Sequence, residues 1–173
     1  IEIGAMTTFR DIETSLLLQE YFSGVLPKAL SNIIGVQFRN VVTVGASVYA
    51  KYGFSDLITA LLALDTEVEL YKGGRMPLAQ FLSKPYEKDL LIKILIRKDR
   101  RRVSYQNFRN SASDFPILNV AISELNQQWT IAVGAMPSRA KIAVKASAAL
   151  SQGNPEINAV AVMAADELTF GTN

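Results

Sequence analysis

The chain has 173 residues, of which 49% are hydrophobic and 20% are charged, and its formal net charge is +2. This composition is typical of a globular protein with one domain or two small ones, and the charge alone indicates neither nucleic acid nor an anionic membrane as a partner. Cysteine and histidine are both absent. Their absence excludes disulfides, thiolate nucleophiles, a histidine base, and zinc or iron–sulfur sites held by these residues.

The first part of the chain predicts helices mixed with short strands. Thr8 or Thr7 is a suitable N-cap for the first helix, Ser55 caps a later one, and β-branched valines around Thr43 indicate an extended run. The expected elements are a strand at 1–5, helices at 9–22 and 26–33, an extended run at 39–44, a helix at 56–64, a strand at 66–71, its hairpin partner at 75–78 after Gly73 and Gly74, a helical turn at 78–82 and a buried strand at 90–96.

The second part of the chain has a different pattern. The expected elements are a charged reversal at 99–102, strands at 103–108, 116–125 and 129–135, and helices at 139–150 and 156–168, the first starting at Pro137 and Ser138 and the second capped by Gly153, Asn154 and Pro155. Short turns between the three strands predict an antiparallel meander followed by two helices. We therefore expect an α+β protein with one unit at 1–98 and another at 99–173.

The small-residue turn after the extended run is the first candidate site. Gly45, Ala46 and Ser47 carry little side-chain bulk, so a ligand could approach the backbone closely. Ser55 and Asp56 place amide groups and an acid together at the start of a helix. From the residues alone this is a candidate anion or nucleotide site, and plain chain reversal is the alternative.

Other polar groups favour structural roles. A basic cluster is expected to be a solvated hairpin tip rather than a nucleic-acid surface, because few aromatic residues lie among the charges. Its members are Arg97, Lys98, Arg100, Arg101 and Arg102. Asp114 precedes Phe115 and Pro116, where a turn-forming acid is expected. The sequence offers no nucleophile–base pair.

A family resemblance rests on several segments in a characteristic order. They are residues 3–8, 39–45, 55–57, 61–70, 74–82, 114–121 and 134–140. Together they resemble the FAD-binding medium subunit of molybdenum hydroxylases, the group of xanthine dehydrogenase and carbon monoxide dehydrogenase. The resemblance implies that the chain contains the second subdomain of a PCMH-type FAD-binding domain, followed by a three-stranded antiparallel sheet with helices like the C-terminal domain of the carbon monoxide dehydrogenase flavoprotein.

The resemblance also implies a set of cofactor contacts. In the family, two glycine-rich loops hold the FAD pyrophosphate, and the segment from Thr43 to Ala46 corresponds to the second loop, with Ala46 in place of a glycine. The implied FAD-binding residues are Thr43, Gly45, Ala46, Ser47, Asp56 and Leu91, with no catalytic residue and no metal ligand. The first loop would precede Ile1, so the chain is expected to be a fragment trimmed at both ends, and FAD is expected in the intact protein.

The function that the resemblance implies is electron transfer by an oxidoreductase. A flavoprotein subunit of this kind would receive electrons from an iron–sulfur subunit, work beside a molybdopterin subunit and pass electrons to NAD or another acceptor, in the cytoplasm. Ala46, Ala50 and Gln106 depart from the family pattern. They support the alternative of a non-catalytic scaffold or interaction module that has lost flavin.

Overall fold

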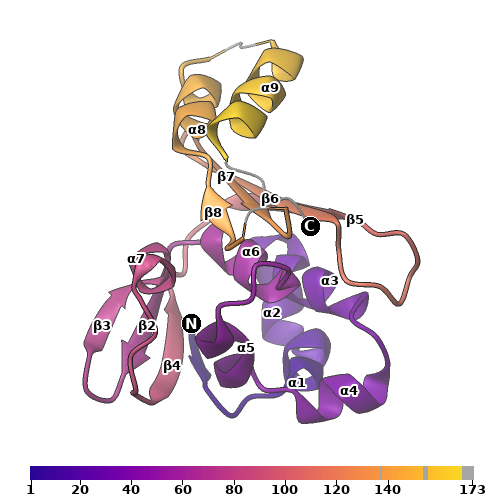
Figure 1. The fold of residues 1–173 in the computed structure, drawn as a ribbon, viewed down its shortest axis with the longest axis vertical. Helices are drawn as coiled ribbons and strands as arrows, with labels where there is room; N and C mark the ends of the chain where they lie inside the picture. The colour runs from indigo at the N-terminus through magenta and orange to yellow at the C-terminus, as the bar shows by residue number, and fades with distance from the viewer. Residues whose placement is uncertain (137, 154–155, 169–173) are drawn as a thin grey trace.

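The computed structural model describes residues 1–136, 138–153 and 156–168 (Figure 1). It contains two four-stranded antiparallel sheets, with strand orders β1-β4-β2-β3 and β5-β6-β7-β8. Figure 1 shows the first sheet beside a cluster of helices, the second sheet above them, and α8 and α9 at the far end. The α+β class is therefore confirmed.

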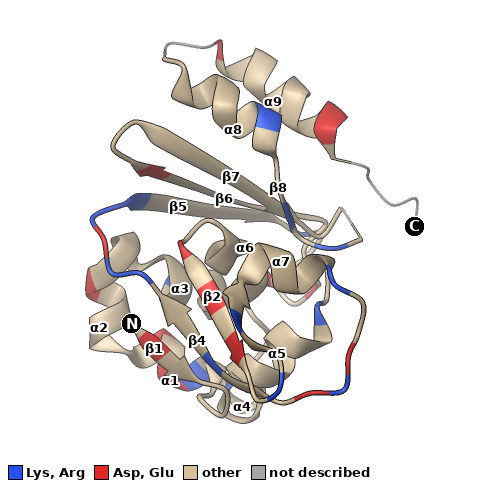
Figure 2. Cartoon of the chain, turned by 90° about the vertical axis from the view of Figure 1, so that its left-hand side faces the viewer, with Lys and Arg blue, Asp and Glu red and all other residues tan. Residues whose placement is uncertain are grey.

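The first sheet follows the alternation of its sequence. Its strands are β1 (Glu2–Gly4), β2 (Thr66–Leu70), β3 (Gly74–Pro77) and β4 (Leu91–Ile96). Val68 of β2 is fully buried, whereas Glu67 is exposed, and Figure 2 shows the acidic side of this strand. The predicted hairpin at Gly73 and Gly74 is confirmed, and Gly74 has φ +66°, which suits glycine.

The predicted helix at 9–22 is interrupted. The structure has α1 (Phe9–Thr14), α2 (Leu16–Glu20), a 3₁₀ turn η1 (Tyr21–Gly24) and then α3 (Val25–Ser31). Thr8 caps α1 in a capping box with Asp11, as the sequence predicts. Ser15 ends α1 and its hydroxyl caps α2, and Phe22 and Ser23 have positive φ. These local breaks are invisible in the apolar periodicity.

The extended run predicted at 39–44 is wrong. The chain forms α4 (Val36–Val41), and only Thr43 makes an isolated bridge, with Thr8. Arg39 is buried on this helix and forms an ion pair with Glu13 of α1, with Nε and Oε2 2.9 Å apart. This tertiary contact outweighs the strand preference of the valines.

Helix α6 (Asp56–Leu62) lies at the centre of the molecule and begins as predicted. The Ser55 hydroxyl accepts a hydrogen bond from the Ile58 amide and caps the helix, and all seven helical residues are buried. It follows α5 (Val44–Ala50), and α7 (Leu78–Ser83) comes after β3. A helix buried on all sides implies neighbours on every face.

The second sheet has one strand more than predicted. The meander of β5 (Arg102–Phe108), β6 (Leu118–Leu125) and β7 (Gln128–Gly134) is confirmed, and β8 (Lys141–Ile142) pairs with β7. The helix expected from 139 instead begins at Val144 as α8 (Val144–Ser151), because residues 141–142 pair with β7. Helix α9 (Ile157–Glu167) has Glu156 as its N-cap. The expected roles of Pro137, Asn154 and Pro155 lie outside the described residues.

The basic cluster at 97–102 joins the two sheets and is not a hairpin tip, because β4 and β5 belong to different sheets. Arg101 is largely buried, pairs with Asp99 and donates to the Ala63 carbonyl oxygen at 3.1 Å. Arg102 remains mostly exposed and pairs with Glu124. Acidic partners, and for Arg101 also a carbonyl oxygen, thus hold three members of the cluster, Arg97, Arg101 and Arg102.

The main hydrophobic core extends across both sheets. Val103, Tyr105 and Ala121 of the second sheet belong to the same buried cluster as Leu61 of α6. A smaller cluster lies under α8 and α9. None of the helices in the described ranges has the length and apolar character needed to span a bilayer.

Candidate functional site

The small-residue turn expected at 45–47 is wrong, because these residues lie in the helix α5. The amides at the start of this helix already have partners. Thr43 is the N-cap, and its hydroxyl oxygen accepts from the Ala46 amide at 3.2 Å. The Val44 and Gly45 amides donate to the carbonyl oxygens of Thr7 and Ala5, each at 2.8 Å. These groups cannot also donate their full hydrogen bonds to a phosphate in this arrangement.

The need for glycine at position 45 comes from Ala5, the residue that follows β1. A Cβ at this position would lie 2.7 Å from the Ala5 Cβ and 2.8 Å from its carbonyl oxygen. Side-chain atoms essentially never approach so closely, so only glycine allows α5 to start against Ala5. The close approach predicted at Gly45 therefore exists, and the partner is the chain itself.

Helix α5 and the N-cap of α6 meet through two serines, Ser47 within α5 and Ser55 before α6. The Ser47 and Ser55 hydroxyls are 3.2 Å apart, and Ser55 also caps α6. The structure thus brings Ser47 close to the start of the helix that carries Asp56. Leu91 is half-buried on β4, and the next residue, Ile92, accepts a hydrogen bond from the Ala5 amide at 2.9 Å. This bond places that end of β4 beside Ala5, whose carbonyl oxygen accepts from the Gly45 amide.

Asp56 is the centre of a buried polar cluster. The carboxylate is in the first turn of α6 and only 4% of the residue is exposed. Its Oδ1 accepts from Arg109 Nη2 at 2.6 Å and from the Tyr105 hydroxyl. No described residue donates to Oδ2. No buried side-chain oxygen of the described residues lacks a partner, so Oδ2 is reached by solvent although the residue as a whole is buried. A carboxylate whose first oxygen accepts two hydrogen bonds and whose second is open to solvent is suited to accept one from a ligand.

Tyr105 is held in its protonated form. Burial, together with the neighbouring Asp56 carboxylate, raises the pKa of Tyr105 well above its usual range. The phenol therefore remains a hydrogen-bond donor to Asp56 at every physiological pH.

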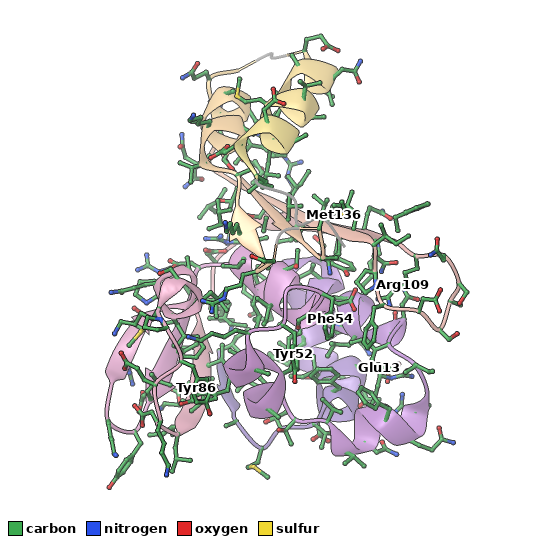
Figure 3. All side chains as sticks on the ribbon, viewed as in Figure 1. Glu13, Tyr52, Phe54, Tyr86, Arg109 and Met136 are labelled. Atoms are coloured by element: carbon green, nitrogen blue, oxygen red, sulfur yellow. The ribbon has the colours of Figure 1, made fainter. Side chains whose placement is uncertain are left out.

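A stack of three aromatic rings adjoins this cluster. Tyr52 and Phe54 are stacked with centroids 5.0 Å apart and planes at 11°, and Phe54 lies 4.4 Å from Phe115. Tyr52 is 55% exposed and Phe115 is 72% exposed. Figure 3 shows Tyr52 and Phe54 on the segment between α5 and α6, with Arg109 on a neighbouring segment.

Sequence reasoning missed Tyr105, Arg109 and this aromatic stack. The aromatic residues before Ser55 were a visible signal, since Tyr52 and Phe54 alternate with Gly53 in a polar loop. Tyr105 and Arg109 gave none, because they lie 49 and 53 residues after Asp56.

The described residues fit a cofactor unevenly. At Asp56 they offer an acceptor oxygen without a protein donor, close to exposed aromatic rings, which suits a group with N–H or O–H donors and a planar ring. At Gly45 and Ala46 the amides are engaged. No group of acidic side chains in the described segments could hold a metal ion. A cofactor therefore fits the residues around Asp56 better than the start of α5.

Comparison with known proteins finds a curated relative of this chain. YgfM of Escherichia coli K12, an uncharacterized protein, is 24% identical over 123 residues, which are 71% of this chain and 46% of YgfM. The chain thus spans about half the length of this curated relative.

Solved structures show the same fold. A chain of the quinoline 2-oxidoreductase of Pseudomonas putida 86 superposes with a TM-score of 0.86 at 18% identity. Carbon monoxide dehydrogenases of Hydrogenophaga pseudoflava and Oligotropha carboxidovorans give TM-scores of 0.84 and 0.87 at 21% and 17% identity. Each match covers 99% of this chain and 66% of the other.

The family itself is established by sequence. The family described as the FAD-binding domain in molybdopterin dehydrogenase matches residues 1–98, more than half of the chain. The chain therefore belongs to the FAD-binding domain family of molybdopterin dehydrogenases.

Proposed function

We propose that this chain is part of the flavin-binding, electron-transferring component of a molybdopterin-dependent oxidoreductase. The family match over residues 1–98 carries the proposal. A bound FAD would supply the redox chemistry that links one-electron and two-electron partners. The protein would bind and orient the cofactor, so it needs no acid–base pair of its own.

The partners are proposed from the family to which the chain belongs. The electron donor would be an iron–sulfur subunit, since these 173 residues contain no cysteine or histidine to hold a cluster. The named relatives are a quinoline oxidoreductase and carbon monoxide dehydrogenases. We extend from them a molybdopterin subunit as partner and NAD or another acceptor as the electron outlet, in the cytoplasm.

The proposed contacts with FAD are made mainly by Asp56 and by residues at the start of α5. Asp56 would accept a hydrogen bond, and Ser47 would exchange its bond with Ser55 for one with the cofactor. Thr43, Gly45, Ala46 and Leu91 complete the proposed set. Residues 1–98 would form this cofactor-binding part, and residues 99–173 would form a second domain that closes over Asp56 through Tyr105 and Arg109.

A flavin-free scaffold module is the second candidate function. It is favoured by one observation, that the amides at Val44, Gly45 and Ala46 are all engaged within the protein. In that case the exposed aromatic stack would contact a partner subunit instead of a ring ligand.

Titration of the purified protein with FAD separates these functions. We expect flavin absorbance to copurify or to be restored by added FAD, and Asp56→Ala to weaken FAD binding by about tenfold or more, because it removes a charged acceptor. Glu67→Ala, an exposed acid on β2, is the control and should leave binding unchanged. Assembly with the partner subunits should survive both substitutions. A protein that assembles normally and binds no FAD would establish the scaffold function instead.

A further inference from the structure

Asp56, the acid that we propose as an FAD contact, accepts hydrogen bonds from two residues in and beside the second sheet. Tyr105 lies on β5, and Arg109 follows directly after this strand. Both donate to the same oxygen, Oδ1 of Asp56, and the Arg109 and Asp56 side chains are only 8% and 5% exposed. No other buried acid among the described residues receives a tyrosine and an arginine together.

We propose that Tyr105 and Arg109 are positioning residues, which hold the Asp56 carboxylate so that its second oxygen accepts a hydrogen bond from an N–H or O–H group of FAD. This inference rests on the proposed function. It assigns roles to two residues that do not themselves contact the cofactor.

The two oxygens of the Asp56 carboxylate differ in their hydrogen-bond partners. Oδ1 has two donors, and one of them is a charged guanidinium at 2.6 Å. Oδ2 has none in the described part of the chain. With Oδ1 fixed from two directions, the carboxylate cannot rotate freely, and Oδ2 is presented in one orientation.

The Arg109 side chain, which donates to Oδ1, is itself held in place by hydrogen bonds. Arg109 Nη1 donates to the Asp114 carbonyl oxygen at 2.5 Å, and its Nε donates to Asn107 Oδ1 at 3.2 Å. Phe115, next to Asp114, packs on Phe54, two residues before Asp56. The segment between β5 and β6 therefore holds the start of α6 by one polar and one apolar contact.

The fixed orientation of the carboxylate also affects the free energy of binding. An acceptor that is already oriented loses less conformational freedom when a ligand binds, so part of the cost of binding is met in the free protein. The guanidinium keeps its charge and the phenol keeps its proton, so both remain donors when the cofactor is absent. Removal of either donor should weaken FAD binding because the Asp56 carboxylate loses its fixed orientation, and not because a direct contact with FAD is lost.

A double-mutant cycle tests this dependence. We expect Tyr105→Phe to raise the Kd for FAD, measured by flavin fluorescence, by about fivefold to tenfold in the otherwise unchanged protein. In an Asp56→Ala background the same substitution should change Kd by less than about twofold, because alanine has no oxygen that could accept from Tyr105. Arg109→Lys provides a second, charge-preserving variant in the same cycle.

Tyr49→Phe is the matched control. This substitution also removes a tyrosine hydroxyl, in this case one that donates to the Glu87 carbonyl oxygen. Tyr49 does not contact Asp56. The substitution should leave Kd unchanged in both backgrounds. Thermal unfolding without FAD verifies that each variant is folded.

The outcomes separate the two proposals. If Tyr105→Phe and Arg109→Lys weaken binding equally with Asp56 and with alanine at this position, or do not weaken it at all, the positioning role is overturned while FAD binding stands. If the unchanged protein binds no FAD, the proposed function fails and the positioning role fails with it.

Discussion

Gly134 lies where the second sheet meets α6, and the space beside its Cα is already filled. A Cβ there would lie 2.2 Å from Thr59 Oγ1 and 2.3 Å from Asn119 Oδ1, two atoms that are hydrogen-bonded at 2.8 Å. Gly134→Ala should therefore destabilise the protein by about 2–3 kcal/mol, since it must displace a buried polar pair. Urea unfolding would measure this.

Gly4→Ala is the control for this prediction. The nearest atom to a Cβ at Gly4 is Thr7 Oγ1 at 3.7 Å, an ordinary contact, and Gly4 is exposed. The expected change is within about 0.5 kcal/mol. A Gly134→Ala protein as stable as the unchanged one would show that the strand moves away from α6 at little cost.

At the scale of elements, the ion pair between Glu13 and Arg39 joins α1 to α4. Arg39 makes two bonds to the carboxylate, at 2.9 and 3.1 Å, and Arg10 adds a third at 2.6 Å. Burial pushes the pKa of Glu13 up, but the bonds from Arg10 and Arg39 outweigh this and hold the pKa below its ordinary value of 4.5. The ionised acid therefore stabilises the fold.

The sign of the pH dependence follows from this lowered pKa. The stabilisation is fully present above pH 4.5 and is lost as the pH falls through the lower pKa of the folded protein. Glu13→Gln should lower stability at neutral pH by about 3 kcal/mol, because the buried Arg39 loses its charge partner, and should flatten the acid side of the stability profile. Glu20→Gln, on an exposed residue of α2, should do neither. An unchanged acid limb in Glu13→Gln would contradict the assignment.

Elements with local signals were predictable, and elements fixed by tertiary contacts were not. The start of α6 follows from Ser55, whose hydroxyl caps the helix within three residues. The run at 39–44 resembles a strand by composition, but Arg39 reaches Glu13, 26 residues away, and the segment is helical. Likewise β8 is only two residues long and exists because β7 offers it a partner.

The same distinction applies to the candidate site. Only the start of α6 could be predicted, because its cap is local. Helix α5 begins where a turn is expected, and its Val44 and Gly45 amides bond to Thr7 and Ala5, far back in the chain. The roles of Thr43, Gly45, Ala46, Ser47, Asp56 and Leu91 toward FAD stay predictions. The partners of Asp56 could not be foreseen, because the fold alone brings Tyr105 and Arg109 to it.

For the whole molecule, α6 ties the two sheets into one structure. Thr59 bonds to Asn119 of β6, and the Gly53 carbonyl oxygen, just before α6, accepts from the Ala135 amide at 2.7 Å. The core cluster is continuous across this boundary. Two sheets with a shared core and shared buried hydrogen bonds should unfold together, even though no strand of one sheet pairs with a strand of the other.

Urea unfolding with two probes tests this cooperativity. The single tryptophan, Trp129, lies on β7 and reports on the second sheet, whereas far-UV circular dichroism is dominated by the helices, of which α1 to α7 precede residue 98. We expect both probes to give the same midpoint. Asn119→Ala should lower both midpoints together, by an amount equivalent to about 1–3 kcal/mol, and the exposed control Asn110→Ala should lower neither. Separate midpoints would mean that the second sheet opens on its own. In that case Tyr105 and Arg109 would leave Asp56 before the rest of the protein unfolds, and the site would depend on a contact that breaks first.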